Sequence, residues 1–141
     1  MSKPIRAVIY ACVSKDDEWQ CITCDDQIEQ AMNFVNEHMD NITIQTVLTD
    51  TGYSDANELL RPGFVKLLCM ILLNDIDLII VDNACRLCTN VKHMFDLNDT
   101  FNRHKVSVLT TDDGKRHDLA SIFYETIDRE LYQMELEDFA H

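Results

Sequence analysis

Ser14 stands where a short apolar run ends and a charged run begins. Residues 7–13 are small, β-branched or aromatic, and residues 15–18 are all charged. The first run favours a buried strand, and in open α/β sheets chemistry gathers at the carboxyl ends of strands. The hydroxyl of Ser14 is therefore a candidate nucleophile, although a serine in such a position is also a common turn or cap residue.

The spacing of residues downstream of Ser14 adds information. Gln20, Thr23 and Gln27 follow it. The order Tyr-Ala-x-Val-Ser, then Gln, Thr and Gln, resembles the N-terminal catalytic domain of the serine site-specific recombinases. The resemblance is strongest to the large integrase and transposon-type members of that family, whose activity is DNA integration and recombination by mobile elements.

Three later segments resemble motifs of the same family in the same order. Residues 50–54 resemble Asp-x-Gly-x-Ser, residues 61–64 resemble Arg-Pro/Glu-Gly-Phe, and residues 85–90 resemble Asp/Ser-Arg-Leu-x-Arg-Asn. The match spans roughly residues 5–111, with a shortened loop and a final helix after it. It implies a resolvase-like three-layer α/β fold with a mainly parallel sheet of four or five strands, helices on both faces and a long C-terminal helix.

Hydrophobic periodicity independently predicts alternating strands and helices in one domain, residues 1–141. Strands are expected at residues 6–14, 42–49, 77–82 and 106–109, and helices at residues 23–38, 62–73, 90–104 and 118–139. Thr23 is a plausible N-cap for the first helix. The helix opened by Pro62 is apolar almost throughout, so we expect it to be buried on most sides, with Cys69 in the core. Residues 50–60 are expected to form a loop.

The resemblance also implies a chemistry. In the family, the serine attacks a DNA phosphodiester and forms a phosphoserine link to the 5′ end, while arginines stabilise the charge on the phosphoryl oxygens. Such chemistry is mostly positioning and electrostatics. The nucleophile corresponds to Ser14 and a supporting serine to Ser54, while Asp50 and Gln20 occupy matching places and Arg86 is the arginine that remains.

Three positions depart from the family pattern. Cys12 replaces the arginine two residues before the nucleophile, Thr89 replaces the second arginine of Arg-x-x-Arg, and Cys85 stands where many relatives have an acid. Losing one preorganised charge-stabilising donor costs about 3–4 kcal/mol. Two such losses, if additive, remove about 6–8 kcal/mol, or about four to six powers of ten in rate. We therefore expect DNA strand transfer by a degraded active site to be impaired or absent.

Net charge also argues against tight DNA binding by this chain alone. The formal net charge is −13 and the pI is about 4.5, whereas affinity for a duplex comes largely from neutralising phosphates. In the resembled family a separate C-terminal domain supplies most of that affinity. No window approaches about 18 uninterrupted apolar residues and no secretion-type segment opens the chain, so a cytoplasmic protein without membrane contact is expected.

The final segment, residues 118–139, carries apolar residues on more than one helical face. An apolar surface this wide favours pairing of two chains, and the family uses its corresponding helix for dimerisation. We therefore expect a homodimer, or a hetero-oligomer with a recombinase, formed through this helix. The alternative is a helix folded back over the sheet. The segment also carries seven acidic residues against one arginine, Arg129, which would repel phosphates.

The cysteines offer a different interpretation. Cys21 with Cys24, and Cys85 with Cys88, are pairs with the two-residue spacing of zinc sites. The pairs are about sixty residues apart, far from the usual ribbon spacing, so we expect no metal and no cofactor. Three hypotheses stay open: a serine recombinase catalytic domain, a catalytically dead dimerising regulator or partner of an active recombinase, and a cysteine-based metal or redox module.

Overall fold

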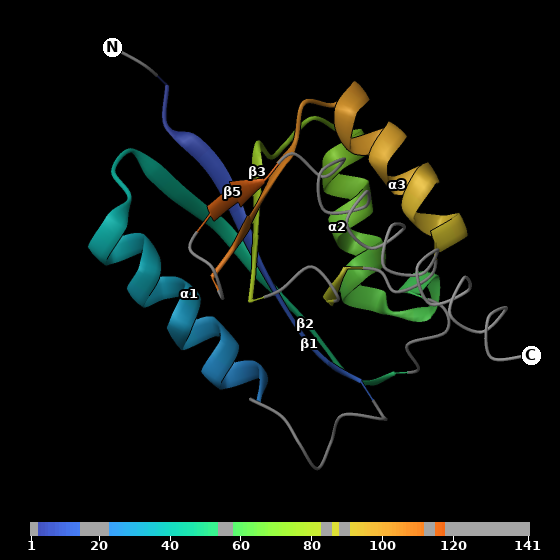
Figure 1. Ribbon diagram of the computed structural model, residues 1–141, viewed down its shortest axis with the longest axis horizontal. Helices are drawn as coiled ribbons and strands as arrows, with labels where there is room; N and C mark the ends of the chain where they lie inside the picture. The colour runs from blue at the N-terminus through green and yellow to red at the C-terminus, as the bar shows by residue number, and fades with distance from the viewer. Residues whose placement is uncertain are drawn as a thin grey trace, which may run out of the picture.

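The computed structural model describes residues 3–14, 23–53, 58–82, 86–87, 91–111 and 115–117. Its elements, in chain order, are β1 (Ile5–Ser14), α1 (Cys24–His38), β2 (Ile42–Tyr53), the 3-10 helix η2 (Glu58–Leu60), α2 (Pro62–Leu72), β3 (Leu78–Val81), α3 (Val91–Arg103), β4 (Ser107–Thr110) and β5 (Lys115–His117) (Figure 1). The helix expected at residues 118–139 lies outside the described residues.

The strands form one five-stranded sheet in the order β2-β1-β3-β4-β5. The first four strands are parallel, and β5 pairs antiparallel with β4. β1 pairs with β2 along its whole length, from Ile5 opposite Ile42 to Ser14 opposite Tyr53. The predicted mainly parallel sheet is confirmed, and its parallel strands bring their carboxyl ends to one edge.

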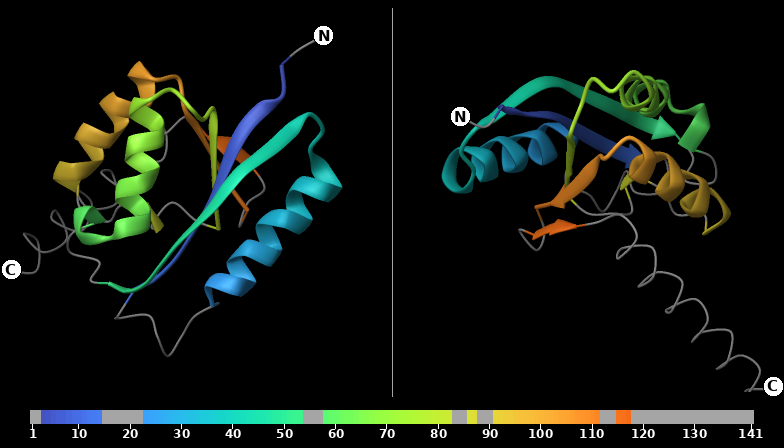
Figure 2. Two further views of the ribbon diagram at one scale, coloured as in Figure 1. Left: turned by 180° about the vertical axis from the view of Figure 1, so that it is seen from behind. Right: turned by 90° about the horizontal axis from the view of Figure 1, so that it is seen from above.

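Helices cover both faces of the sheet, as predicted. The side chains of Ala7 and Ile9 pack with α1 in one core cluster, whereas Val8, Tyr10 and Cys12 pack with α2 and α3 in the other. Figures 1 and 2 show α2 and α3 side by side, with α1 apart from them. The two-residue period of β1 thus divides its side chains between two buried layers.

The first helix begins where the sequence predicts. The hydroxyl of Thr23 accepts a hydrogen bond from the backbone N–H of Asp26 at 3.1 Å, and α1 ends at His38. The helix presents Gln27, Ala31 and Val35 to the sheet. The N-cap prediction is confirmed.

Two expectations about the middle of the chain are wrong. Residues 50–53 continue β2 instead of starting a loop, because β1 runs beside them and the carboxylate of Asp50 is bonded in the interior. The apolar helix is buried on one side only. Phe64, Leu67 and Ile71 are inside, while Cys69 is exposed and Leu72 and Leu73 are 57% and 70% exposed. Helical spacing, not apolar content, decides which side chains face the sheet.

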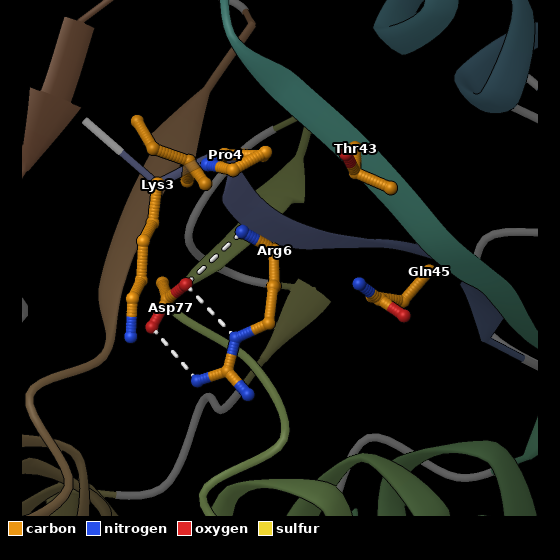
Figure 3. Close-up of a pocket in the computed structure, with 7 residues that line it drawn as sticks. Lys3, Pro4, Arg6, Thr43, Gln45 and Asp77 are labelled. Carbon is orange, nitrogen blue, oxygen red and sulfur yellow. Dashed lines mark hydrogen bonds and ion pairs between the residues drawn. The ribbon is translucent and has the colours of Figure 1, made fainter. Parts of the chain in front are cut away.

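An ion pair ties β1 to β3 at the amino end of the sheet (Figure 3). The guanidinium of Arg6 donates to both carboxylate oxygens of Asp77 at 3.1 Å, and the backbone N–H of Arg6 donates to the same carboxylate at 3.0 Å. The hydrogen bond to Asp77 raises the pKa of Arg6. The pair borders an open hollow lined by Lys3, Thr43 and Gln45, at the opposite end of β1 from Ser14.

A matched pair of leucines on α2 tests the one-sided burial of this helix. Leu67→Ala removes a side chain from the core and should lower the free energy of unfolding by about 2–5 kcal/mol. Leu72→Ala should change it by about 0.5 kcal/mol or less, because that side chain is mostly in solvent. Urea denaturation measures both values, and equal losses from the two leucines would contradict the placement of α2.

Candidate functional site

The carboxyl edge of the sheet collects the polar residues that the sequence singles out. Ser14 is the last residue of β1, and Asp50 of β2 lies opposite Cys12 in the strand register. Asp82 directly follows β3, and Arg86 lies four residues further on. The structure therefore brings Ser14, Asp50 and Arg86 to the same edge. Gln20, Ser54, Cys85 and Thr89 lie outside the described residues.

The carboxylate of Asp50 is buried and holds the start of α2. It accepts hydrogen bonds from the hydroxyl of Tyr10 at 2.7 Å and from the backbone N–H groups of Gly63 and Phe64 at 2.8 and 2.9 Å. A negative charge at this position satisfies free helix N–H groups and complements the helix dipole. The described contacts of Asp50 therefore position α2 against β1 and β2.

Gly63 completes the same unit. A Cβ at residue 63 would stand 2.8 Å from the carbonyl oxygen of Thr49 and 2.9 Å from a carboxylate oxygen of Asp50. Only glycine lets α2 approach β2 closely enough for the carboxylate of Asp50 to reach its N–H groups. The motifs at residues 50–54 and 61–64 thus meet in one contact.

Tyr10 links this unit to the strand that carries Ser14. Burial raises the pKa of Tyr10 far above its usual range, and the neighbouring Cys12 and the hydrogen bond to Asp50 raise it further. The ring also packs edge-to-face on Phe64, with centroids 5.9 Å apart. Tyr10 is therefore a neutral hydrogen-bond donor within the core, two residues before Cys12 on the same strand face.

Sequence reasoning missed Arg61. This side chain is only 1% exposed, and its Nη1 donates to the backbone carbonyl of Arg86 at 3.0 Å. Its charge acts on Cys12, opposing the rise in that thiol's pKa. Arg61 thus adds a second guanidinium to the polar residues at the carboxyl edge of the sheet, close to the backbone of Arg86. Its place as the first residue of the 61–64 motif was the signal that could have identified it.

Cys12 occupies the buried end of β1. It is 2% exposed, and burial is the main cause of its raised pKa. The thiol therefore stays protonated near neutral pH, which makes it a poor nucleophile and metal ligand. Its backbone is held by the amide of Gln27 on α1, which accepts from the N–H of Cys12 and donates to its carbonyl, both at 3.0 Å. Gln27 thereby fixes the strand two residues before Ser14.

Arg86 is engaged by a carboxylate that the sequence analysis did not single out. Its Nε donates to one oxygen of Asp82 at 2.7 Å and its Nη2 to the other at 3.0 Å. The two side chains are only 11% and 7% exposed. Together with Arg61 and Asp50, this pair makes a set of two positive and two negative side chains, with no net formal charge.

The cysteine hypothesis gains no support from the residues in view. The thiol of Cys24 lies 3.8 Å from the carbonyl oxygen of Asp50 and 3.5 Å from the hydroxyl of Thr51. Across the described ranges, no group of three or more His, Cys, Asp or Glu side chains could hold a metal ion. Cys21, Cys85 and Cys88 lie outside those ranges, so the absence of a metal stays a prediction.

Residues 7–139 match the family described as Resolvase, N terminal domain. This chain belongs to the resolvase family. The resemblance to serine recombinase catalytic domains is confirmed. No curated protein matches the chain. Within the described part of this resolvase-family chain, no helix is long and apolar enough to cross a membrane.

Solved structures agree with this assignment. The N-terminal catalytic domain of TP901-1 integrase is 20% identical with a TM-score of 0.71, over 94% of this chain and 98% of that one. A resolvase family site-specific recombinase from Streptococcus pneumoniae is 14% identical with a TM-score of 0.69, over 96% and 94%. These two likenesses show the resolvase-like fold.

A transposon protein is somewhat nearer in sequence. The C-terminal catalytic domain of ISC1926 TnpA, an IS607-like serine recombinase, is 25% identical with a TM-score of 0.60, over 76% of this chain and 69% of that one. The fold predicted from the motifs is therefore shared with the catalytic domains of an integrase and of an IS607-like serine recombinase.

Removing the carboxylate of Asp50 should destabilise the resolvase-family domain. Asp50→Ala leaves two helix N–H groups and a buried tyrosine hydroxyl without their acceptor, so we expect a loss of about 2–4 kcal/mol in the free energy of unfolding. Tyr10→Phe removes one donor and should cost about 1 kcal/mol. Urea denaturation compares the two variants. If Asp50→Ala unfolds like the unaltered protein, the carboxylate does not hold α2 as described.

Proposed function

We propose that this chain is a serine recombinase catalytic-domain homologue whose DNA strand transfer is impaired. The observation that carries the proposal is the arrangement at the carboxyl edge of the sheet in a chain of the resolvase family. Ser14 is the last residue of β1, which lies between β2 and β3, and at the same edge Arg61 donates to the backbone carbonyl of Arg86. Phosphoryl transfer requires a nucleophile and fixed cations that stabilise the charge on the phosphoryl oxygens.

The impairment rests on what surrounds that arrangement. Cys12 is a small buried thiol where the family has an arginine, and Thr89 replaces another. Arg61 faces inward and is almost fully buried, while Arg86 is paired with Asp82. The two missing arginines are each worth about 3–4 kcal/mol in the transition state by analogy with other preorganised donors. Residual cleavage by the unaltered chain should therefore be negligible.

A second candidate function is a dimerising regulator or partner of an active recombinase. The exposed apolar side chains favour it. Several lie on or near η2, α2 and α3 and are more than half exposed, namely Leu59, Leu60, Leu72, Leu73 and Phe95. Exposed apolar surface of this kind is typical of protein contact sites. In this role the chain would contribute its fold and its surface, and catalysis would come from the partner.

The strand-transfer proposal predicts no covalent product from the unaltered chain. The protein is incubated with a nicked suicide substrate of a recombinase target, and denaturing gels are searched for a protein–DNA adduct. None is expected, because too little positive charge is available to stabilise the transition state. An adduct that disappears in Ser14→Ala would overturn the impairment.

Restoring the family residues provides the converse test. Cys12→Arg together with Thr89→Arg should raise adduct formation from nothing to a measurable level, with Ser14→Ala in the same background as the control. An arginine at residue 12 enters a buried position, and overpacking typically costs about 1–3 kcal/mol. Circular dichroism must therefore show that the restored variant is folded. A folded variant that still forms no adduct would favour the regulatory function.

A further inference from the structure

Asp82 and Arg86 form a nearly buried ion pair at the carboxyl edge of the sheet. Asp82 follows β3 directly, and Arg86, four residues later in the sequence, lies within hydrogen-bond distance of it. The two hydrogen bonds, 2.7 and 3.0 Å long, use Nε and Nη2, one complete edge of the guanidinium. With side-chain exposures of 7% and 11%, the pair is screened little by solvent.

A carboxylate and a phosphate compete for such an edge. Both present two oxygens at a spacing that matches two parallel N–H groups of arginine, which is why arginine binds either of them in a bidentate manner. When the carboxylate of Asp82 occupies the Nε–H and one N–H of Nη2, this edge of the guanidinium cannot also bind the non-bridging oxygens of a phosphodiester.

The charges of the neighbouring side chains also disfavour binding of an anion at Arg86. Arg61 and Arg86 are balanced by Asp50 and Asp82, so these four side chains present no net formal charge to an anion. The whole chain carries −13, and no long-range attraction compensates for the local neutrality. Asp50 already serves Tyr10 and the N-terminus of α2, which leaves Asp82 as the acid whose removal would most directly free a cation.

We propose that Asp82 competes with phosphate oxygens for the guanidinium of Arg86 and neutralises the charge of Arg86 in an ion pair. The Nε/Nη2 edge of Arg86 then binds a phosphate-class oxyanion only when the ion pair with Asp82 is broken. This inference rests on the proposed function, because it takes Arg86 as the group that contacts the phosphodiester. It assigns a role to a residue outside the motifs that the sequence analysis used.

The test uses inorganic phosphate as the probe and needs no DNA cleavage. Asp82→Asn keeps the size of the side chain but removes its charge, so binding measured by calorimetry should become about tenfold tighter or more, as expected for loss of a close like charge. Asp82→Asn combined with Arg86→Gln should lose this gain. Unchanged phosphate binding in folded Asp82→Asn would overturn the proposal.

The ion pair at the other end of the sheet supplies a matched control. Asp77 holds Arg6 through the same two guanidinium nitrogens (Figure 3), and it lies about 16 Å from Asp82 along β3. Asp77→Asn removes the same charge beyond the ~10 Å range of exposed charges in ordinary salt. It should leave phosphate binding unchanged. An equal gain in Asp77→Asn would show an effect of net charge and overturn the competition.

A measurement on the unaltered protein covers the case in which Asp82→Asn does not fold, since breaking a nearly buried ion pair is often strongly destabilising. The Nε–H signal of Arg86 is followed by nuclear magnetic resonance during a phosphate titration. It should not move, because Asp82 keeps that donor. A saturating shift would overturn the proposal.

The outcome separates this inference from the recombinase function. Tighter phosphate binding in Asp82→Asn, with no DNA adduct even from the folded variant restored at residues 12 and 89, supports the competition and counts only against strand transfer. A Ser14-dependent adduct from the restored variant, with unchanged phosphate binding in folded Asp82→Asn, supports the proposed function and overturns the competition.

Discussion

The buried carboxylate of Asp50 is the contact on which the arrangement at the carboxyl edge of the sheet depends. It accepts from Tyr10 on β1 and from the first N–H groups of α2, while it belongs itself to β2. Three elements are thus joined at one charged group, where each hydrogen bond to a carboxylate is stronger than one between neutral groups. Because Gly63 leaves no side chain in the gap, α2 begins close to the sheet. Arg61, the residue just before α2, is thereby placed close enough to donate to the backbone carbonyl of Arg86.

The same constraint explains why some family positions act as scaffold. Asp50 and Gln27 come from family motifs, yet their described bonds go to backbone groups and a tyrosine inside the domain. They fix where β1 ends, and therefore where Ser14 stands. Phosphoryl transfer depends on position to within fractions of an ångström. A residue can thus be essential to this chemistry without touching the substrate.

Much of the fold was predictable from the sequence. The apolar run at residues 78–81, the cap at Thr23 and Pro62 at the start of α2 each mark an element through local chemistry, and the parallel sheet follows from their order. Burial of α2 was mispredicted, because an apolar composition does not reveal which side chains a sheet can reach. The pairing of Asp82 with Arg86 was missed for a related reason. It is a side-chain contact outside the regular helices and strands, and no periodic pattern in the sequence predicts it.

We propose that electrostatic neutrality at the strand ends contributes to poor DNA strand transfer by this resolvase-family domain. The most direct measurement is the single-turnover rate of Ser14-dependent adduct formation in the variant restored at residues 12 and 89, with and without Asp82→Asn. The account predicts a faster rate when Asp82 is neutral, because Arg86 then faces the phosphodiester with its charge available. A rate that is unchanged or lower in the folded Asp82→Asn variant, or an unaltered chain as fast as the restored one, would contradict it.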